Sequence, residues 1–82
     1  MKEMIIKLAP FVLKQTVYII DKETKEVKED KIPQKELSKY ISLHENDIDH
    51  VHLFGNEDFI RKIQEECISK YKVCKCDFKI NK

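Results

Sequence analysis

The order of apolar patterns along the chain is the feature that most constrains its fold. Three strand-like runs come first, followed by a helical pattern, a fourth strand, a second helical pattern and a last strand. The chain has one glycine and two prolines, which leaves little sequence for long loops between these elements. The 82 residues therefore predict a single domain, residues 1–82, of the α/β or mixed α+β class with one mixed sheet.

The strand patterns also predict positions within the sheet. Residues 4–9 and 16–20 are apolar at odd and even positions alike, which is typical of central strands. Residues 26–32 are mostly charged, and charged side chains are typical of an edge strand. Residues 48–54 form the fourth strand, and residues 73–80 alternate apolar and polar side chains, as expected of the second edge.

Two helices are expected between the later strands. Pro33 suits a first helical turn and introduces the pattern of residues 34–44. Gly55 closes the fourth strand, and Asn56 is a good N-cap for a second helix that runs to about Tyr71. Its expected apolar stripe consists of Phe59, Ile60, Ile63, Cys67, Ile68 and Tyr71.

This order of elements resembles the core of the ribonuclease H-like and actin-like superfamily. The resemblance implies a five-stranded sheet with order 3-2-1-4-5 and two helices on one face. It also implies where a nuclease would place metal-binding acids: on the first strand, in the first helix and after the fourth strand. The predicted first strand offers Lys7 and no acid, although Glu36, Glu57 and Asp58 stand near the other two places.

ATP-binding members of the superfamily need glycine-rich phosphate turns, and this chain has only Gly55. We therefore expect no catalysis and no cofactor. A degenerate metal-dependent nuclease that uses Asp58 remains a third hypothesis.

Histidine and cysteine pairs could form a zinc site if they shared a face of the sheet. His50 and His52 have period-two spacing, and so do Cys74 and Cys76. The cysteines share their parity with apolar residues of the last strand, which should face the helices. The histidines instead alternate with apolar residues, so they should face the opposite way, and we expect no metal site.

Charge suggests a second hypothesis for function. The formal net charge is only +1, but bases outnumber acids in the last third of the chain. A nucleic acid could bind there through Arg61, Lys62, Lys70, Lys72, Lys75 and Lys79. The short apolar N-terminus predicts no membrane span, and three cysteines, an odd number, indicate a reducing cytoplasm.

The leading hypothesis concerns the face of the sheet that the helices leave open. Central strands present apolar side chains whichever way they are turned, and exposed apolar patches usually mark interfaces. We expect contacts with a protein partner, and a homodimer, through Ile6, Tyr18, His50, His52 and Phe54. Two alternatives stay open: strand addition at the edge formed by residues 74–80, and a segment, residues 11–13, that folds back over the open face.

The size and composition of the chain support this hypothesis. Its small size, its many lysines, glutamates and isoleucines, and its lack of enzyme motifs resemble the accessory proteins of phages and mobile elements. We expect a non-catalytic protein-interaction module, such as a phage inhibitor of host defence or an adaptor that acts on a host protein.

Overall fold

The computed structural model describes residues 1–81, so Lys82 of the expected domain lies outside the described residues. Five strands form one mixed sheet in the order β3-β2-β1-β4-β5, as predicted. The strands are β1 (Lys2–Leu8), β2 (Lys14–Asp21), β3 (Val27–Pro33), β4 (Ile48–Gly55) and β5 (Asp77–Asn81). The helices are a 3-10 turn η1 (Gln34–Glu36), α1 (Leu37–His44) and α2 (Glu57–Ser69).

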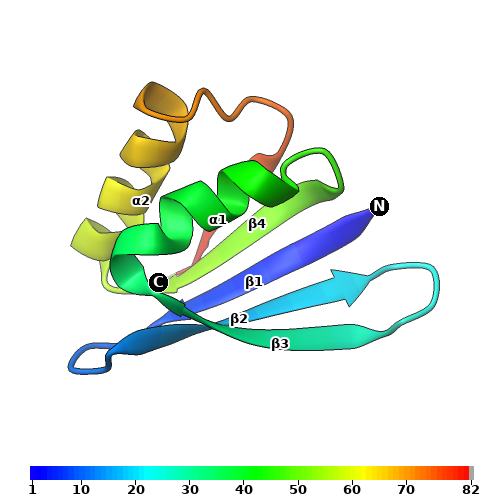
Figure 1. The fold of residues 1–82 in the computed structure, drawn as a ribbon, viewed down its shortest axis with the longest axis horizontal. Helices are drawn as coiled ribbons and strands as arrows, with labels where there is room; N and C mark the ends of the chain where they lie inside the picture. The colour runs from blue at the N-terminus through cyan, green and yellow to red at the C-terminus, as the bar shows by residue number, and fades with distance from the viewer. Residues whose placement is uncertain (82) are drawn as a thin grey trace.

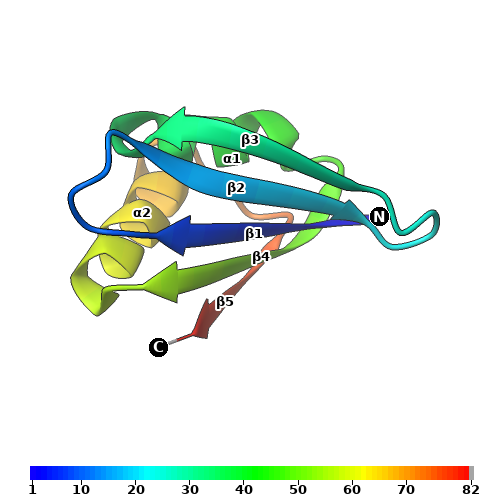
Figure 2. The ribbon, with the colours of Figure 1, turned by 90° about the horizontal axis from the view of Figure 1, so that it is seen from below.

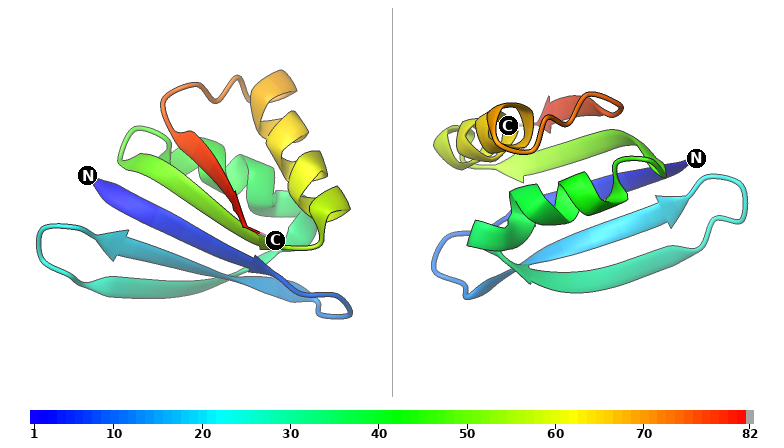
Figure 3. Two further views of the ribbon diagram at one scale, coloured as in Figure 1. Left: turned by 180° about the vertical axis from the view of Figure 1, so that it is seen from behind. Right: turned by 45° about the horizontal axis from the view of Figure 1, so that its top comes forward.

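The sheet is antiparallel on one side of β1 and parallel on the other. β1 pairs antiparallel with β2, which pairs antiparallel with β3. β4 runs parallel to β1, and β5 runs parallel to β4. The two crossovers contain α1 and α2, and both helices lie on one face of the sheet (Figures 1 and 2). The other face carries no helix, which is seen from behind in Figure 3.

The hydrophobic core lies between this sheet and the two helices. Every second residue of β1 points into it, and so do alternate residues of β2 and, after an irregularity near Asp49, of β4. Complete burial of one such aliphatic side chain contributes about 1.5–3 kcal/mol to folding. The fully or almost fully buried side chains are Met4, Ile6, Leu8, Val17, Ile19, Leu37, Ile41, Ile48, Val51, Leu53, Ile60, Ile63, Cys67, Val73 and Cys76.

Local signals fix the start of α2 and its contact with α1. The side chain of Asn56 accepts hydrogen bonds from the backbone N–H groups of Asp58 and Phe59, which confirms the predicted N-cap. Across the helix pair, the buried Ser38 donates its hydroxyl to Glu66 Oε2 at 2.9 Å. This bond satisfies a polar group at the contact between the helices.

Gly55 allows the ends of β1 and β4 to approach closely. Its φ is +134°, and a Cβ at this position would lie 2.4 Å from the carbonyl oxygen of Leu8. No other residue type fits there without a shift of the backbone. The only glycine of the chain therefore has a structural role at the end of the parallel strand pair.

Three expectations are wrong in detail. Ile6 is completely buried beneath the helices. The charged Glu3 and Lys7 lie on the other side of β1, together with Ile5, and keep that side facing outward. The last strand begins at Asp77 rather than at residue 73. Ile68 is 53% exposed, so the buried stripe of α2 is narrower than predicted.

Candidate protein-interaction surfaces

The uncovered side of the sheet, here called the open face, carries outward side chains in ordered rows. In the central row, Ile5 lies between Tyr18 of β2 and His52 of β4. One neighbouring row contains Ile20, Glu3 and His50, and the other contains Thr16, Lys7 and Phe54. The register therefore brings four of the five predicted partner-binding residues onto this face, with Ile5 in the place expected for Ile6.

Apolar side chains of the open face shield one another only in part. Ile5, Tyr18 and Ile20 are half-buried, and Phe54 is 38% exposed. The Lys7 ammonium lies 5.7 Å from the centroid of the Tyr18 ring, a cation–π distance. The centre of the open face is thus apolar and aromatic, with charged groups beside it.

A charged cluster lies at one end of the open face, at the start of β1 and β4. We call it the Glu3 cluster, and its members are Glu3, Lys22, Asp49, His50 and His52. Glu3 Oε1 lies 3.7 Å from Lys22 Nζ, 3.9 Å from His50 Nδ1 and 3.6 Å from His52 Nε2. Lys22 also donates a hydrogen bond to Asp49. Separate segments of the chain therefore meet in one ionic network.

The contact between Lys22 and Asp49 shifts both groups toward their charged forms. The hydrogen bond from Lys22 lowers the pKa of Asp49 below its ordinary value, and the nearby His50 acts in the same direction. The same hydrogen bond raises the pKa of Lys22. His50 Nδ1 lies 3.3 Å from Asp49 Oδ1, and both atoms are buried without a well-formed hydrogen bond among residues 1–81.

The connection between β1 and β2 carries an exposed apolar tip, defined by Phe11, Val12 and Leu13. Phe11 is 105% exposed relative to its reference and Leu13 is 94% exposed. The connection extends past the end of the sheet in Figures 1 and 2. The segment does not fold back across the open face, which excludes that alternative in this structure.

The base of the apolar tip is held by a buried glutamine. Gln15 is 1% exposed, its Oε1 accepts a hydrogen bond from Ala9 N at 2.8 Å, and its Nε2 donates to Ala9 O at 2.9 Å. A further bond joins Nε2 to the side chain of Gln34 at 3.3 Å. Phe11 itself has φ +61°, a left-handed conformation that is rare for a bulky residue. The sequence signal for this tip is a proline followed by three apolar residues outside any periodic pattern.

The edge available for strand addition is shorter than predicted. β5 covers only Asp77–Asn81, and Cys74 and Cys76 precede it. Cys76 is buried, whereas Cys74 is exposed. Phe78 and Ile80 lie on the helix side in register with Val51 and Leu53. His50 and His52 are thus on the opposite side of the sheet from this apolar row.

The predicted nucleic-acid-binding residues do not form one patch. Arg61 lies 3.8 Å from Glu57 and 3.9 Å from Asp58, its neighbours on α2. Lys75 donates to Asn46, and Lys79 lies on the open face in register with His52. Only Lys62 and Lys70 share a hollow, of about 330 Å³, where Lys35 joins them. Lys72 is exposed and has φ +57°.

Acidic residues are also dispersed. Glu36 lies in η1, whereas Glu57 and Asp58 lie in the first turn of α2 beside Arg61. Within residues 1–81, no group of three or more His, Cys, Asp or Glu side chains has a metal-binding arrangement.

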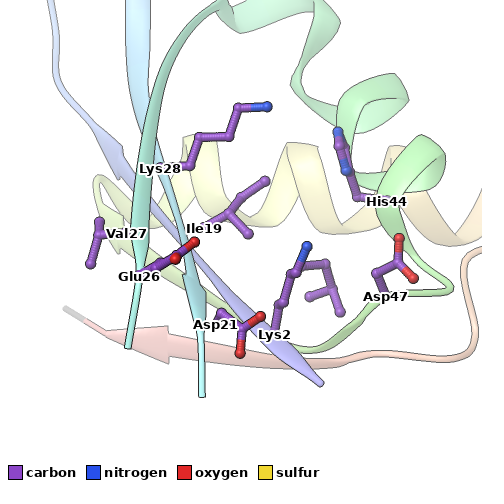
Figure 4. Close-up of a pocket in the computed structure, with 9 residues that line it drawn as sticks. Lys2, Ile19, Asp21, Glu26, Val27, Lys28, His44 and Asp47 are labelled. Carbon is purple, nitrogen blue, oxygen red and sulfur yellow. The ribbon is translucent and has the colours of Figure 1, made fainter. Parts of the chain in front are cut away.

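A small cavity of about 220 Å³ lies at the end of the sheet opposite the apolar tip (Figure 4). Figure 4 shows Lys28 and Ile19 on one side of this space and His44 on the other. Asp21, which also lines it, accepts hydrogen bonds from the backbone N–H groups of Thr24 and Glu23, and these lower its pKa. Acids and bases alternate around the cavity, so its charge favours no single class of ligand.

Comparison with known proteins gives no relative for this chain: no family model, no curated protein and no solved structure matches it. Within residues 1–81, none of the helices has the length and apolar character needed to cross a bilayer.

Proposed function

We propose that the protein is a non-catalytic interaction module that binds another protein through the open face of its sheet. The observation that carries this proposal is the apolar centre of a face that no helix covers, formed by Ile5, Tyr18, Ile20 and Phe54. Aromatic side chains at the centre of a patch, with charges around them, are typical of protein interfaces. The small size and the composition of the chain favour a host protein as the partner, bound by this protein as a phage-type inhibitor or adaptor.

The size of the open face suits such a partner. Five strands at about 4.8 Å spacing, each about seven residues long, give a surface of roughly 500 Å² in projection. A standard interface uses about 800 Å² of accessible surface on each partner. The open face with its rim is therefore large enough for one specific contact. β5, at five residues, offers much less through strand addition.

The Glu3 cluster makes the charge distribution of the open face differ between its two ends. Its acids and histidines occupy one end, whereas Lys7 and Lys31 extend from the other end of the same face. Complementary charges mainly fix orientation and speed association. A partner should therefore present an apolar centre with acidic groups toward Lys7.

Affinity capture from a bacterial lysate tests this proposal. The bait is the tagged protein, compared with its Tyr18→Asp and Phe54→Asp variants. The control is Ile68→Asp, which places the same charge on an exposed apolar position of α2. We expect the wild type and the control to retain the same protein and both open-face variants to lose it. Equal capture by all four baits would refute the use of this face.

Nucleic acid binding is the second candidate, supported by the hollow that Lys35, Lys62 and Lys70 share. Phosphate contacts make affinity fall steeply with salt. Each contact raises log Kd by about one unit for every tenfold rise in salt concentration. Retention of a mixed-sequence DNA or RNA that weakens with salt, and is lost in a Lys62→Glu, Lys70→Glu variant, would support this candidate. Retention unaffected by that variant would exclude the hollow.

A further inference from the structure

An apolar hollow lies between the end of β3 and α1; it begins at Ile32 and Pro33, near the apolar tip, and extends along α1 to Leu43. We call it the α1 groove, lined by Ile32, Pro33, Glu36, Lys39, Tyr40 and Leu43, with a volume of about 330 Å³. Leu43 is 70% exposed at its border. The groove lies on the helix side of β3, because Ile32 is in register with the buried Gln15. It is therefore separate from the open face.

The wall of the α1 groove is already formed in the single chain. The hydroxyl of Tyr40 donates to Asp30 Oδ2 at 3.4 Å, and its ring packs against His44 with centroids 4.5 Å apart. Both contacts hold the ring in place. A surface that needs no rearrangement loses less conformational entropy when it is occupied.

The apolar tip has the complementary shape. It is a convex group of three apolar side chains, and Gln15 holds its base through two hydrogen bonds to Ala9. A phenylalanine buries about 150–250 Å² when it is enclosed. The groove is large enough for one such side chain, and no other segment within residues 1–81 covers the tip.

The positions of tip and groove favour a second copy of the chain as the occupant. Lys14, next to the tip, is paired with Pro33, which lines the groove. The two features therefore lie side by side on one molecule, yet the exposed tip does not enter its own groove. A two-fold axis between them brings each tip to the groove of the other copy, so both contacts form at once.

The charges beside the tip and the groove are complementary, as a contact between two copies requires. Lys14 follows the tip directly, and Glu36 lies at the border of the groove. Both are exposed, and neither has an ion-pair partner among the described residues. Docking of the tip in the groove of a second copy brings these opposite charges together.

We propose that two copies of the chain form a two-fold dimer in which the apolar tip of each copy inserts into the α1 groove of the other. The paired contacts bury on the order of 1,000 Å² in total, which is near the lower limit of specific interfaces. A dissociation constant in the micromolar range is expected. Both open faces remain free in this dimer, so it does not depend on the function proposed above.

Sedimentation equilibrium over about 1–200 µM protein tests the dimer, a range that brackets a micromolar Kd. We expect the wild type to dimerise and Leu13→Asp and Leu43→Asp each to weaken dimerisation at least about 30-fold. Ile68→Asp is the matched control and should dimerise normally. Circular dichroism checks that each variant folds. A wild type that stays monomeric throughout, or a dimer that tolerates both tip and groove variants, overturns the proposal and leaves these surfaces to a different partner.

Charge reversal separates a contact between copies from an effect within one copy. Lys14→Glu alone and Glu36→Lys alone should each weaken dimerisation by about tenfold, because like charges then meet at both contacts. In a mixture of these two variants, the heterodimer joins opposite charges at both contacts, one in the native sense and one reversed. Mixing should therefore restore dimerisation. No recovery on mixing contradicts the exchange of tips.

Discussion

Phe11 has two unfavourable properties at once: its side chain is fully exposed and its backbone is left-handed. A left-handed conformation costs a residue with a Cβ about 1–2 kcal/mol, a cost that glycine does not have. Residues held in such conformations cluster at functional positions. A phenylalanine at this position is unfavourable for the single chain and is consistent with the contact between copies proposed above.

Replacement of Phe11 by glycine should therefore stabilise the monomer. We expect Phe11→Gly to raise the free energy of unfolding by about 0.5–1 kcal/mol, since it removes the strain but gives the unfolded chain more entropy. Urea unfolding at low protein concentration measures this change. Val12→Gly is the control, because Val12 does not have positive φ, and it should be neutral or destabilising. Equal destabilisation by both changes would show that Phe11 is not strained.

The three cysteines should differ sharply in reactivity. Burial raises the pKa of the Cys67 thiol to about 12 and also raises the pKa of Cys76, whereas Cys74 is exposed. The thiolate is the reactive form, so at pH 8 Cys67 should react on the order of 1,000-fold more slowly than an ordinary thiol. Alkylation of the native protein followed by peptide mass mapping should find Cys74 modified first. Early modification of Cys67 would mean that α2 opens readily.

At the scale of elements, the Glu3 cluster joins the start of β1 and β4 to the turn after β2. The lowered pKa of Asp49 in this cluster predicts that the stability of the protein depends on pH. Because the pKa of Asp49 is lowered on folding, the cluster stabilises the protein above the unfolded value of 3.8, and this contribution is lost as pH falls through the folded pKa. Thermal unfolding of the wild type and Asp49→Asn should therefore differ at pH 7, and the difference should shrink as pH falls below 3.8 and vanish once pH is below the folded pKa. A difference that stays constant between about pH 3 and pH 7 would exclude an ionic role for Asp49.

The same elements show what can be derived from the sequence. Period and charge are enough for the succession of strands and helices, for the edge position of β3 and for the Asn56 cap, because each depends on a local pattern. The order of the strands within the sheet is implied only by the resemblance to the ribonuclease H-like superfamily. The side of β1 that faces inward cannot be read from apolar residues alone, since Ile5 and Ile6 have opposite parities. The charges of Glu3 and Lys7 decide it in favour of burying Ile6.

Features that depend on distant segments cannot be predicted in the same way. The Glu3 cluster needs the register between β1 and β4, which no local pattern contains. The late start of β5 reflects burial of Cys76 within a loop, where alternation resembles that of a strand. The sequence leaves open whether the three apolar residues of the tip fold back over the sheet; in the structure they are exposed, and the side chain of Gln15 holds the base of the tip through Ala9.

At the scale of the whole molecule, an 82-residue chain has a small core and three uncovered apolar surfaces: the open face, the apolar tip and the α1 groove. A domain of this size has only a limited core, so the proposed association would add measurably to its stability. If the tip and the groove pair between copies, folding and dimerisation are linked by mass action. The midpoint of thermal unfolding must then depend on protein concentration.

For a dimer that unfolds to two chains, each tenfold rise in concentration stabilises the folded state by about 0.7 kcal/mol per chain once dimers predominate. For a domain of this size the unfolding midpoint should rise by about 3–5 °C per tenfold step. Leu13→Asp should abolish this dependence, whereas Tyr18→Asp, on the open face, should keep it. Differential scanning calorimetry at several concentrations measures both. A concentration-dependent midpoint that is lost in Tyr18→Asp but kept in Leu13→Asp would place the contact between copies on the open face instead, because only a change in the surface that pairs in the dimer can remove the effect of mass action.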